Sequence, residues 1–108
     1  MKKRRSDRNH IIYKITNTSN EDFYIGLTVL RGSAYLRSAK LRLAQHISRA
    51  TTQDFDWALC NSIREYGSDS FKVQILEVIR GKQSAHTRET ELIKNMQPTL
   101  NTVSITKN

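Results

Sequence analysis

Two short segments rich in β-forming residues open the chain, and polar turn formers separate them. The segments are 11–16, Ile-Ile-Tyr-Lys-Ile-Thr, and 23–26, Phe-Tyr-Ile-Gly, and the polar run is 17–22. Apolar and aromatic runs around a cluster of Asn, Ser and Asp predict a β-hairpin. Strand alternation places Tyr13 and Ile15 on the same face. Residues 27–35 have no clear period, and a loop is expected there.

A helical pattern follows, because apolar residues then recur every three or four positions. The predicted helix covers 36–50, and its buried stripe is Leu36, Ala39, Leu43, Ile47 and Ala50. A second helix is expected from the region of Asp54 to Tyr66, with Gly67 marking its end. Its apolar side is Phe55, Leu59, Ile63 and Tyr66. Trp57 is expected to take part in helix packing.

The last third of the chain predicts one strand and one helix. Residues 71–79, Phe-Lys-Val-Gln-Ile-Leu-Glu-Val-Ile, form the longest apolar stretch and are expected to be a strand. Gly81 and Ser84 open a helix that runs to about Met96, and Pro98 prevents its continuation.

Glu89 breaks the amphipathic pattern of this last helix. It lies four residues after Ala85 and three before Leu92, so it shares their inward stripe with Met96, whereas Glu91 points away. An unpaired buried carboxylate is costly. Two explanations remain open on spacing alone: a structural salt bridge to an arginine, or a ligand for a divalent cation.

The composition is that of one small globular domain. The chain has 108 residues, of which 37% are hydrophobic and 26% charged. No run of about eighteen apolar residues occurs, which argues against a membrane-spanning or membrane-associated protein. The single cysteine, Cys60, excludes an intramolecular disulfide and suits a reducing compartment, so a cytoplasmic location is expected.

The charge is distributed unevenly along the sequence. The formal net charge is +8; residues 1–53 hold 11 Lys and Arg against 3 acids, while residues 54–108 hold 7 of each. A basic excess confined to half of a small domain is what a polyanion-binding surface requires, since each neutralised phosphate releases counterions. We therefore expect nucleic acid as the partner.

Five sequence pieces in order resemble the GIY-YIG nuclease superfamily over residues 11–101. The pieces are Ile11-Ile12-Tyr13, Tyr24-Ile25-Gly26, Arg42-x3-His46, Glu89-Thr90-Glu91-Leu92-Ile93-Lys94, and Pro98 with Asn101. Ile11 replaces the first glycine of the family name, and the stretch between Gly26 and Arg42 is longer than in compact members. The resemblance implies an α/β (α+β) fold: a small three-stranded, mainly antiparallel sheet flanked by helices, with the site on one face of the sheet. The expected organisation is a basic tail over 1–9, the nuclease domain over 10–102 and a C-terminal tail over 103–108.

The resemblance also implies phosphodiester hydrolysis with one Mg²⁺ or Mn²⁺ per active site, held by Glu89. By the same resemblance Tyr13 is the general base and Arg42 grips the phosphate. His46 is expected to relay or orient a proton with Tyr13, and Tyr24 to hydrogen-bond the phosphate or the attacking water. A phenol acts as a base only if cations lower its pKa, a field expected from Arg42 and His46. Gly26 and Asn101 are expected near the site as structural residues. His86, although within four residues of Glu89, is expected to face solvent.

Arg37, five residues before Arg42, is the alternative catalytic arginine. Arg42 is preferred because only it lies one helical turn from His46. Arg37, Lys40 and Arg49 are otherwise expected to bind DNA. The resulting hypothesis is a metal-dependent DNA endonuclease of the GIY-YIG type, free-standing and of phage or mobile-element origin, in a bacterial or phage-infected cell. The alternative is a nucleic-acid-binding module that keeps the fold without cutting. Cleavage of both DNA strands would need a homodimer or two successive encounters. Recognition of a particular DNA would have to come from the 27–35 loop, the basic tail or a separate recognition partner.

Overall fold

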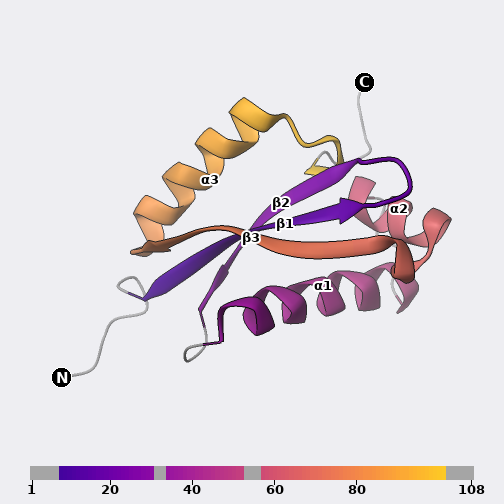
Figure 1. The fold of residues 1–108 in the computed structure, drawn as a ribbon, viewed down its shortest axis with the longest axis horizontal. Helices are drawn as coiled ribbons and strands as arrows, with labels where there is room; N and C mark the ends of the chain where they lie inside the picture. Colours follow the sequence, from indigo (N-terminus) through magenta and orange to yellow (C-terminus); the bar gives the residue numbers. More distant parts are fainter. Residues whose placement is uncertain (1–7, 31–33, 53–56, 102–108) are drawn as a thin grey trace.

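The computed structural model describes residues 8–30, 34–52 and 57–101 of the chain. They form an α+β fold in which helices cover both faces of a three-stranded antiparallel sheet (Figure 1). The fold class expected from the sequence is thereby confirmed. The elements in chain order are β1 (Asn9–Asn17), β2 (Phe23–Val29), α1 (Tyr35–Thr52), α2 (Ala58–Tyr66), η2 (Ser68–Ser70), β3 (Phe71–Arg80), α3 (Lys82–Met96) and η3 (Thr99–Asn101).

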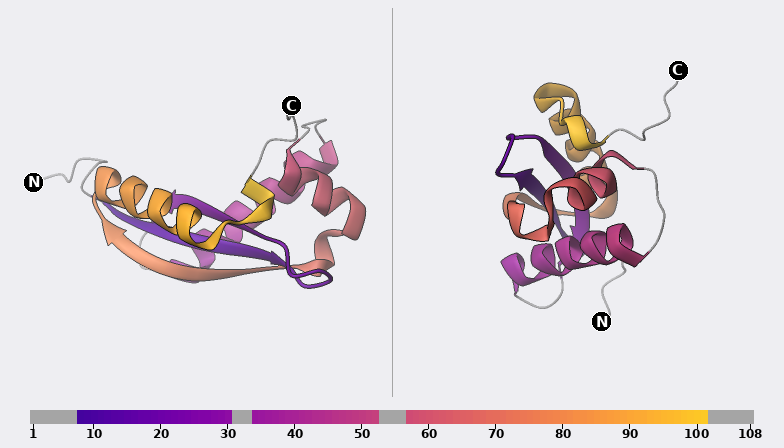
Figure 2. Two further views of the ribbon diagram at one scale, coloured as in Figure 1. Left: turned by 90° about the horizontal axis from the view of Figure 1, so that it is seen from above. Right: turned by 90° about the vertical axis from the view of Figure 1, so that its right-hand side faces the viewer.

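β1 is the central strand of the sheet, whose order is β2-β1-β3. Both neighbours run antiparallel to it. Consecutive residues of β1 point to opposite faces, yet Ile11, Ile12 and Tyr13 are all 0% exposed. A strand buried on both faces must be covered by two layers. Accordingly, α1 and α3 lie on opposite sides of the sheet, as the end-on view in Figure 2 shows.

The larger core lies between the sheet and α1, α2 and η3. Its buried members are Ile11, Tyr13, Ile15, Ala39, Ala50, Leu59, Cys60, Ile63, Phe71 and Leu100. On the other side, Ala85 of α3 is fully buried, and α3 contacts all three strands. None of the described helices is long and apolar enough to cross a membrane.

β2 is longer than the sequence pattern predicted. Leu27, Thr28 and Val29, expected in a loop over 27–35, continue the strand and pair with Ile12, Ile11 and His10. Pairing with the central strand satisfies backbone groups that an irregular loop would leave to solvent, and this outweighs the weak local pattern. The loop prediction is also wrong at its other end, because α1 begins at Tyr35.

Three apolar residues assigned to buried stripes are exposed at the ends of their helices. Leu36 is 45% exposed, Tyr66 40% and Met96 37%. Each lies within one turn of a helix end, where the stripe extends past the sheet it covers. The helix assignments themselves are confirmed, as is the strand over 71–79, which extends to Arg80.

The second helix begins later than expected. α2 starts at Ala58, after Trp57, which takes the N-cap position in an extended conformation without a side-chain cap. Trp57 is 39% exposed, so it is less buried than a helix-packing role implied. Asp54 and Phe55 lie outside the described residues.

Candidate active site

A pocket of about 290 Å³ brings together side chains from β1, β2, α1 and α3. Its lining residues are His10, Tyr13, Tyr24, Leu27, Thr28, Val29, Arg42, Lys82, His86 and Glu89. Because α1 and α3 cover opposite faces of the sheet, a pocket with walls from both helices and from β2 lies along the outer edge of β2. The resemblance implied a site on one face of the sheet, whereas this pocket has lining residues from the helices on both sides.

Tyr13 is at the centre of this arrangement. A Cβ atom added to Gly26 would lie 2.4 Å from both Cζ and the hydroxyl oxygen of Tyr13. No side chain fits there, so the glycine lets the Tyr13 ring lie flat across β2 and reach the pocket. The Tyr13 hydroxyl and Nε2 of His46 are 3.2 Å apart and share a hydrogen bond.

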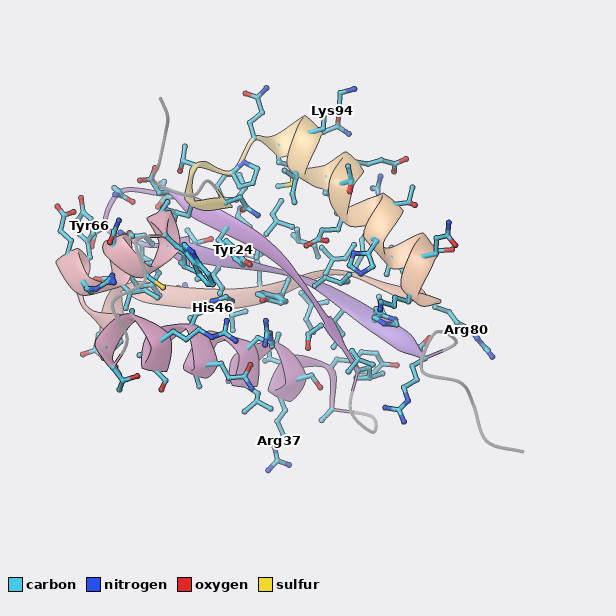
Figure 3. The ribbon with its side chains drawn as sticks, turned by 180° about the vertical axis from the view of Figure 1, so that it is seen from behind. Tyr24, Arg37, His46, Tyr66, Arg80 and Lys94 are labelled. Atoms are coloured by element: carbon cyan, nitrogen blue, oxygen red, sulfur yellow. The ribbon has the colours of Figure 1, made fainter. Side chains whose placement is uncertain are left out.

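Tyr24 completes an aromatic cluster with these two residues. Its ring centroid lies 6.2 Å from that of Tyr13 and 5.1 Å from that of His46, edge-on to the imidazole. Figure 3 shows Tyr24 and His46 pointing toward each other between the sheet and α1. Three proton-carrying groups are therefore in mutual contact beside the pocket.

α1 supplies both Arg42 and His46, one helical turn apart. Nη1 of Arg42 donates a hydrogen bond to the side chain of Gln45. Nε of Arg42 and Nδ1 of His46 are buried and have no hydrogen-bond partner in the described part of the chain. Buried polar atoms normally have a partner, so these two indicate a place for a ligand or a bound water.

Burial controls the ionisation of the aromatic cluster. It raises the pKa of Tyr13 and of Tyr24, although the Arg42 guanidinium opposes this at both hydroxyls. Burial, with the nearby charges of Arg42 and Arg49, lowers the pKa of His46 to about 4. The expected lowering of the Tyr13 pKa by two cations is therefore not found: His46 is neutral at pH 7, and desolvation outweighs Arg42.

Glu89 points inward from α3, as the helix pattern predicted. Its side chain is 19% exposed, compared with 56% for Glu91. Burial raises the pKa of its carboxyl, and nearby His86, with Nδ1 3.7 Å from Oε1, acts in the opposite direction. Arg88 pairs instead with Glu77 and Glu91. In the described chain no Lys or Arg forms an ion pair with Glu89, so the structural salt bridge to an arginine is absent there.

The donor set around Glu89 suits a hard divalent cation that keeps most of its water. The described residues contain no cluster of three or more His, Cys, Asp or Glu able to enclose a metal. One half-buried carboxylate in an open pocket is how Mg²⁺ is commonly held, with waters and phosphate oxygens as further ligands. The residues present therefore fit a single ion of this kind.

Asn101 fixes the backbone of β2 beside the pocket, next to Gly26. The Asn101 side chain accepts a hydrogen bond from the Ile25 backbone N–H and donates one to the Ile25 carbonyl, each 2.8 Å long. Ile25 lies between Tyr24 and Gly26, so this clamp fixes the strand at the point where Tyr13 crosses it. Asn101 thus holds the β2 backbone, and Gly26 leaves the space that the Tyr13 ring occupies.

The residues expected to bind DNA lie on α1 outside the pocket. Arg37 is exposed and points away from the protein (Figure 3), beside a separate hollow with Ala34, Ser38 and Leu41. Lys40 borders a groove between α1 and β3. Arg49 is half-buried and close enough to His46 to lower its pKa. Arg42 alone of the two candidate arginines lines the pocket.

Four further lining residues have chemistry that the sequence analysis did not use: His10, Thr28, Lys82 and His86. Lys82, His86 and Glu89 follow one another at i, i+4 and i+7, and this spacing could have placed them on one face of α3. His86, expected to face solvent, is 56% exposed and still lines the pocket. No local sequence pattern predicts that His10 and Thr28 line the pocket, because the pairing of β1 with β2 brings them to it.

Comparison with known proteins supplies the family. The sequence profile of the GIY-YIG catalytic domain matches residues 9–102. The chain belongs to the GIY-YIG family. No curated protein matches it.

Two solved structures share the fold of this GIY-YIG domain. One is the catalytic domain of homing endonuclease I-TevI, 25% identical, with a TM-score of 0.64 over 87% of this chain and 95% of that one. The other is the catalytic domain of intron endonuclease I-TevI with one glutamate replaced by alanine, 21% identical, with a TM-score of 0.66 over 93% and 96% of the two chains. The three-stranded antiparallel sheet with its helices is therefore the fold of a known nuclease catalytic domain.

Proposed function

We propose that this protein is a metal-dependent DNA endonuclease that hydrolyses phosphodiester bonds. The observation that carries the proposal is the convergence of Tyr13, Tyr24, Arg42 and Glu89 on one pocket, with His46 hydrogen-bonded behind Tyr13. Hydrolysis of a phosphodiester needs a proton acceptor for the attacking water and positive charge for the developing negative charge on phosphorus. The pocket offers both.

Tyr13 and His46 supply the proton acceptor as a pair. His46 is neutral above about pH 4, so with its proton on Nδ1 it presents Nε2 as an acceptor to the Tyr13 hydroxyl. The Tyr13 oxygen takes a proton from the attacking water while its own proton passes to Nε2. This relay leaves no free phenolate, but it makes His46 an imidazolium, the form that burial, Arg42 and Arg49 disfavour. The negative charge of a bound phosphate would have to compensate that positive charge for the relay to operate.

Arg42 supplies permanent positive charge for the scissile phosphate. Its side chain lines the pocket, and its Nε has no hydrogen-bond partner in the described residues. A guanidinium is a planar donor whose charge does not depend on pH in the working range. Tyr24, whose hydroxyl is kept protonated by burial, is suited to donate a hydrogen bond to the phosphate or to the attacking water.

Glu89 would hold the divalent ion, Mg²⁺ or Mn²⁺, one per active site. Such an ion, when bound, stabilises negative charge on the phosphate. The carboxylate suits this role because it is half-buried, faces the pocket and has no Lys or Arg partner among the described residues. The charge of the ion also compensates an otherwise costly buried carboxylate.

DNA is the proposed substrate. The two structural neighbours are catalytic domains of a homing endonuclease and of an intron endonuclease. The basic excess of residues 1–53 supports a polyanionic partner, with Arg37, Lys40 and Arg49 of α1 as candidate phosphate contacts. Double-strand cleavage by a protein with one active site would require a homodimer or two successive encounters with the DNA. Sequence specificity would require a recognition partner.

Incubation with supercoiled plasmid in Mg²⁺ and in EDTA tests the proposal. We expect nicked or linear DNA with Mg²⁺, none in EDTA, and none with Glu89→Gln in either buffer. Glu89→Gln removes a half-buried charge at nearly constant volume, so its melting temperature in EDTA should equal or exceed that of the wild type. Glu91→Gln, on the exposed side of the same helix, is the matched control and should cleave normally.

Two results would contradict the proposal. Cleavage by Glu89→Gln in Mg²⁺ at the wild-type rate would remove the metal-ligand role. DNA binding by the wild type without cleavage in Mg²⁺ or Mn²⁺ would favour the alternative, a nucleic-acid-binding module on the same fold. A half-buried carboxylate facing a phosphate site weakens a pure binder by repulsion, so this arrangement favours the enzyme.

A further inference from the structure

His86 lies one helical turn before Glu89 and has no place in the proposed reaction. Nδ1 of its ring is 3.7 Å from Oε1 of Glu89, and both side chains line the same pocket. The described residues give the His86 ring no other partner. Its side chain is 56% exposed, so the imidazole can turn toward the pocket without breaking another contact.

The two atoms are close enough to bind one metal ion after a small rotation of the side chains. Donors bound at about 2.1 Å lie about 3.0 Å apart when adjacent in an octahedron and about 4.2 Å apart when opposite. On one helix face the two ligands would be adjacent, so the separation of 3.7 Å would have to shorten by about 0.7 Å, which rotation of the 56% exposed His86 side chain allows. On a helix, residues at i and i+3 project side by side, as they do in metal sites of helical bundles built from Glu and His at this spacing.

We infer that His86 is a second ligand of the divalent ion held by Glu89, so that the site has one oxygen and one nitrogen donor from α3. The inference rests on the proposed function, since it concerns the same ion. An imidazole adds little affinity for Mg²⁺, which prefers oxygen, and considerably more for Co²⁺ or Ni²⁺. The pocket should therefore bind transition metals more tightly than a lone carboxylate would.

Other roles for His86 predict different behaviour. If it were only the ion-pair partner of Glu89, removing it would free the carboxylate, and affinity for every divalent ion would rise or stay level. If it contacted a DNA phosphate, removing it would weaken DNA binding and leave metal binding in the absence of DNA unchanged. Metal binding without DNA therefore separates the three roles.

The test is titration of the DNA-free protein with Co²⁺ and with Mg²⁺ by calorimetry, for wild type, His86→Ala, Glu89→Gln and the control Gln83→Ala. We expect His86→Ala to weaken Co²⁺ binding at least about tenfold, the scale for losing a group that supports a metal site, and to change Mg²⁺ binding by less than about threefold. Gln83 is exposed on α3 and absent from the pocket lining, so Gln83→Ala should match the wild type.

A spectroscopic readout completes the test. Mn²⁺ bound to the wild type should show electron spin echo modulation from a coordinated ¹⁴N nucleus, and His86→Ala should lose it. Equal Co²⁺ affinity and no change in this signal in folded His86→Ala would overturn the inference while leaving Glu89 as a ligand. Wild-type affinity of Glu89→Gln for both metals would instead overturn the proposed metal role of Glu89 itself.

Discussion

At the scale of single residues, burial decides which protonation states the pocket holds. Tyr13 is 0% exposed and His46 3% exposed, and desolvation is the main influence on the pKa of each. Desolvation favours neutral forms, so phenol and imidazole are both uncharged near pH 7. A neutral imidazole can accept the proton of the phenol to which it is hydrogen-bonded. An imidazolium has no free nitrogen lone pair and could not.

The low pKa of His46 has a consequence for folding stability. The unfolded chain binds a proton at the ordinary value of 6.5, whereas the folded chain binds it only near pH 4. Between these values the unfolded state binds more protons, so this residue makes the folded state less stable as the pH falls. We expect the free energy of unfolding of wild type, measured relative to His46→Asn by urea titration, to fall by up to about 3 kcal/mol from about pH 7 to about pH 4. Parallel pH profiles for the two proteins would contradict the buried neutral imidazole.

The two arginines of α1 differ in where they lie, and this gives them different expected roles. Arg42→Ala should lower the rate of plasmid cleavage about 100- to 1000-fold, the effect of losing one donor to a developing charge, with a modest loss of binding. Arg37→Ala should weaken duplex binding, and the slope of log affinity against log salt should fall by the amount expected for about one phosphate contact. The cleavage rate at saturating protein should not change. Similar cleavage by wild type and Arg42→Ala would reverse the assignment.

The sequence predicted some of these residues for physical reasons and missed others. Glu89 could be predicted because a carboxylate on an apolar helical stripe must face the protein. The neutral state of His46 could not, since it depends on how deeply α1 packs on the sheet. His10 reaches the pocket only because the strand that contains it pairs with Val29.

At the scale of elements, β2 is the strand at which the pocket gathers side chains from helices on both sides of the sheet. Gly26 leaves room for the Tyr13 ring, and Asn101 fixes the neighbouring Ile25 backbone with two hydrogen bonds. η3, although distant in sequence, therefore positions β2. The hairpin, the strand over 71–79 and the last helix could be predicted from local periodicity, whereas the three residues that lengthen β2 depend on pairing.

Gly26→Ala tests this element-level account. The added methyl group would overlap Cζ and the hydroxyl of Tyr13 and must displace the ring. We expect the plasmid cleavage rate to fall about 100-fold, the effect of misplacing a reacting group by about 1 Å, and stability to fall by about 1–3 kcal/mol. Circular dichroism should show unchanged secondary structure. Full cleavage activity in a folded Gly26→Ala protein would show that Tyr13 need not lie where the structure places it.

At the scale of the whole molecule, the uneven charge and the pocket give separate contributions to DNA recognition. The excess of basic residues lies in 1–53, while the proposed metal ligand Glu89 lies in the balanced half. Binding should therefore survive removal of the metal, and cleavage should not.

Duplex binding measured in EDTA tests this separation. We expect affinity to fall steeply with salt, by about 100-fold between about 50 and about 200 mM if about four phosphates are contacted. Retardation of a labelled duplex at several salt concentrations gives the slope. An affinity that does not change over this range would contradict a polyanion-binding role for the basic half.

The central claim is that the Tyr13 hydroxyl moves the proton of the attacking water, and Tyr13→Phe tests it most directly. The change removes one oxygen from a fully buried ring, so packing and DNA binding should persist. The single-turnover cleavage rate in Mg²⁺, at protein concentrations that saturate the DNA, should fall at least about 100-fold, the lower range for loss of a general base. Tyr66→Phe, an exposed tyrosine of α2, serves as the control and should cleave at the wild-type rate. A Tyr13→Phe protein that binds DNA and cleaves it as fast as the wild type would contradict the account.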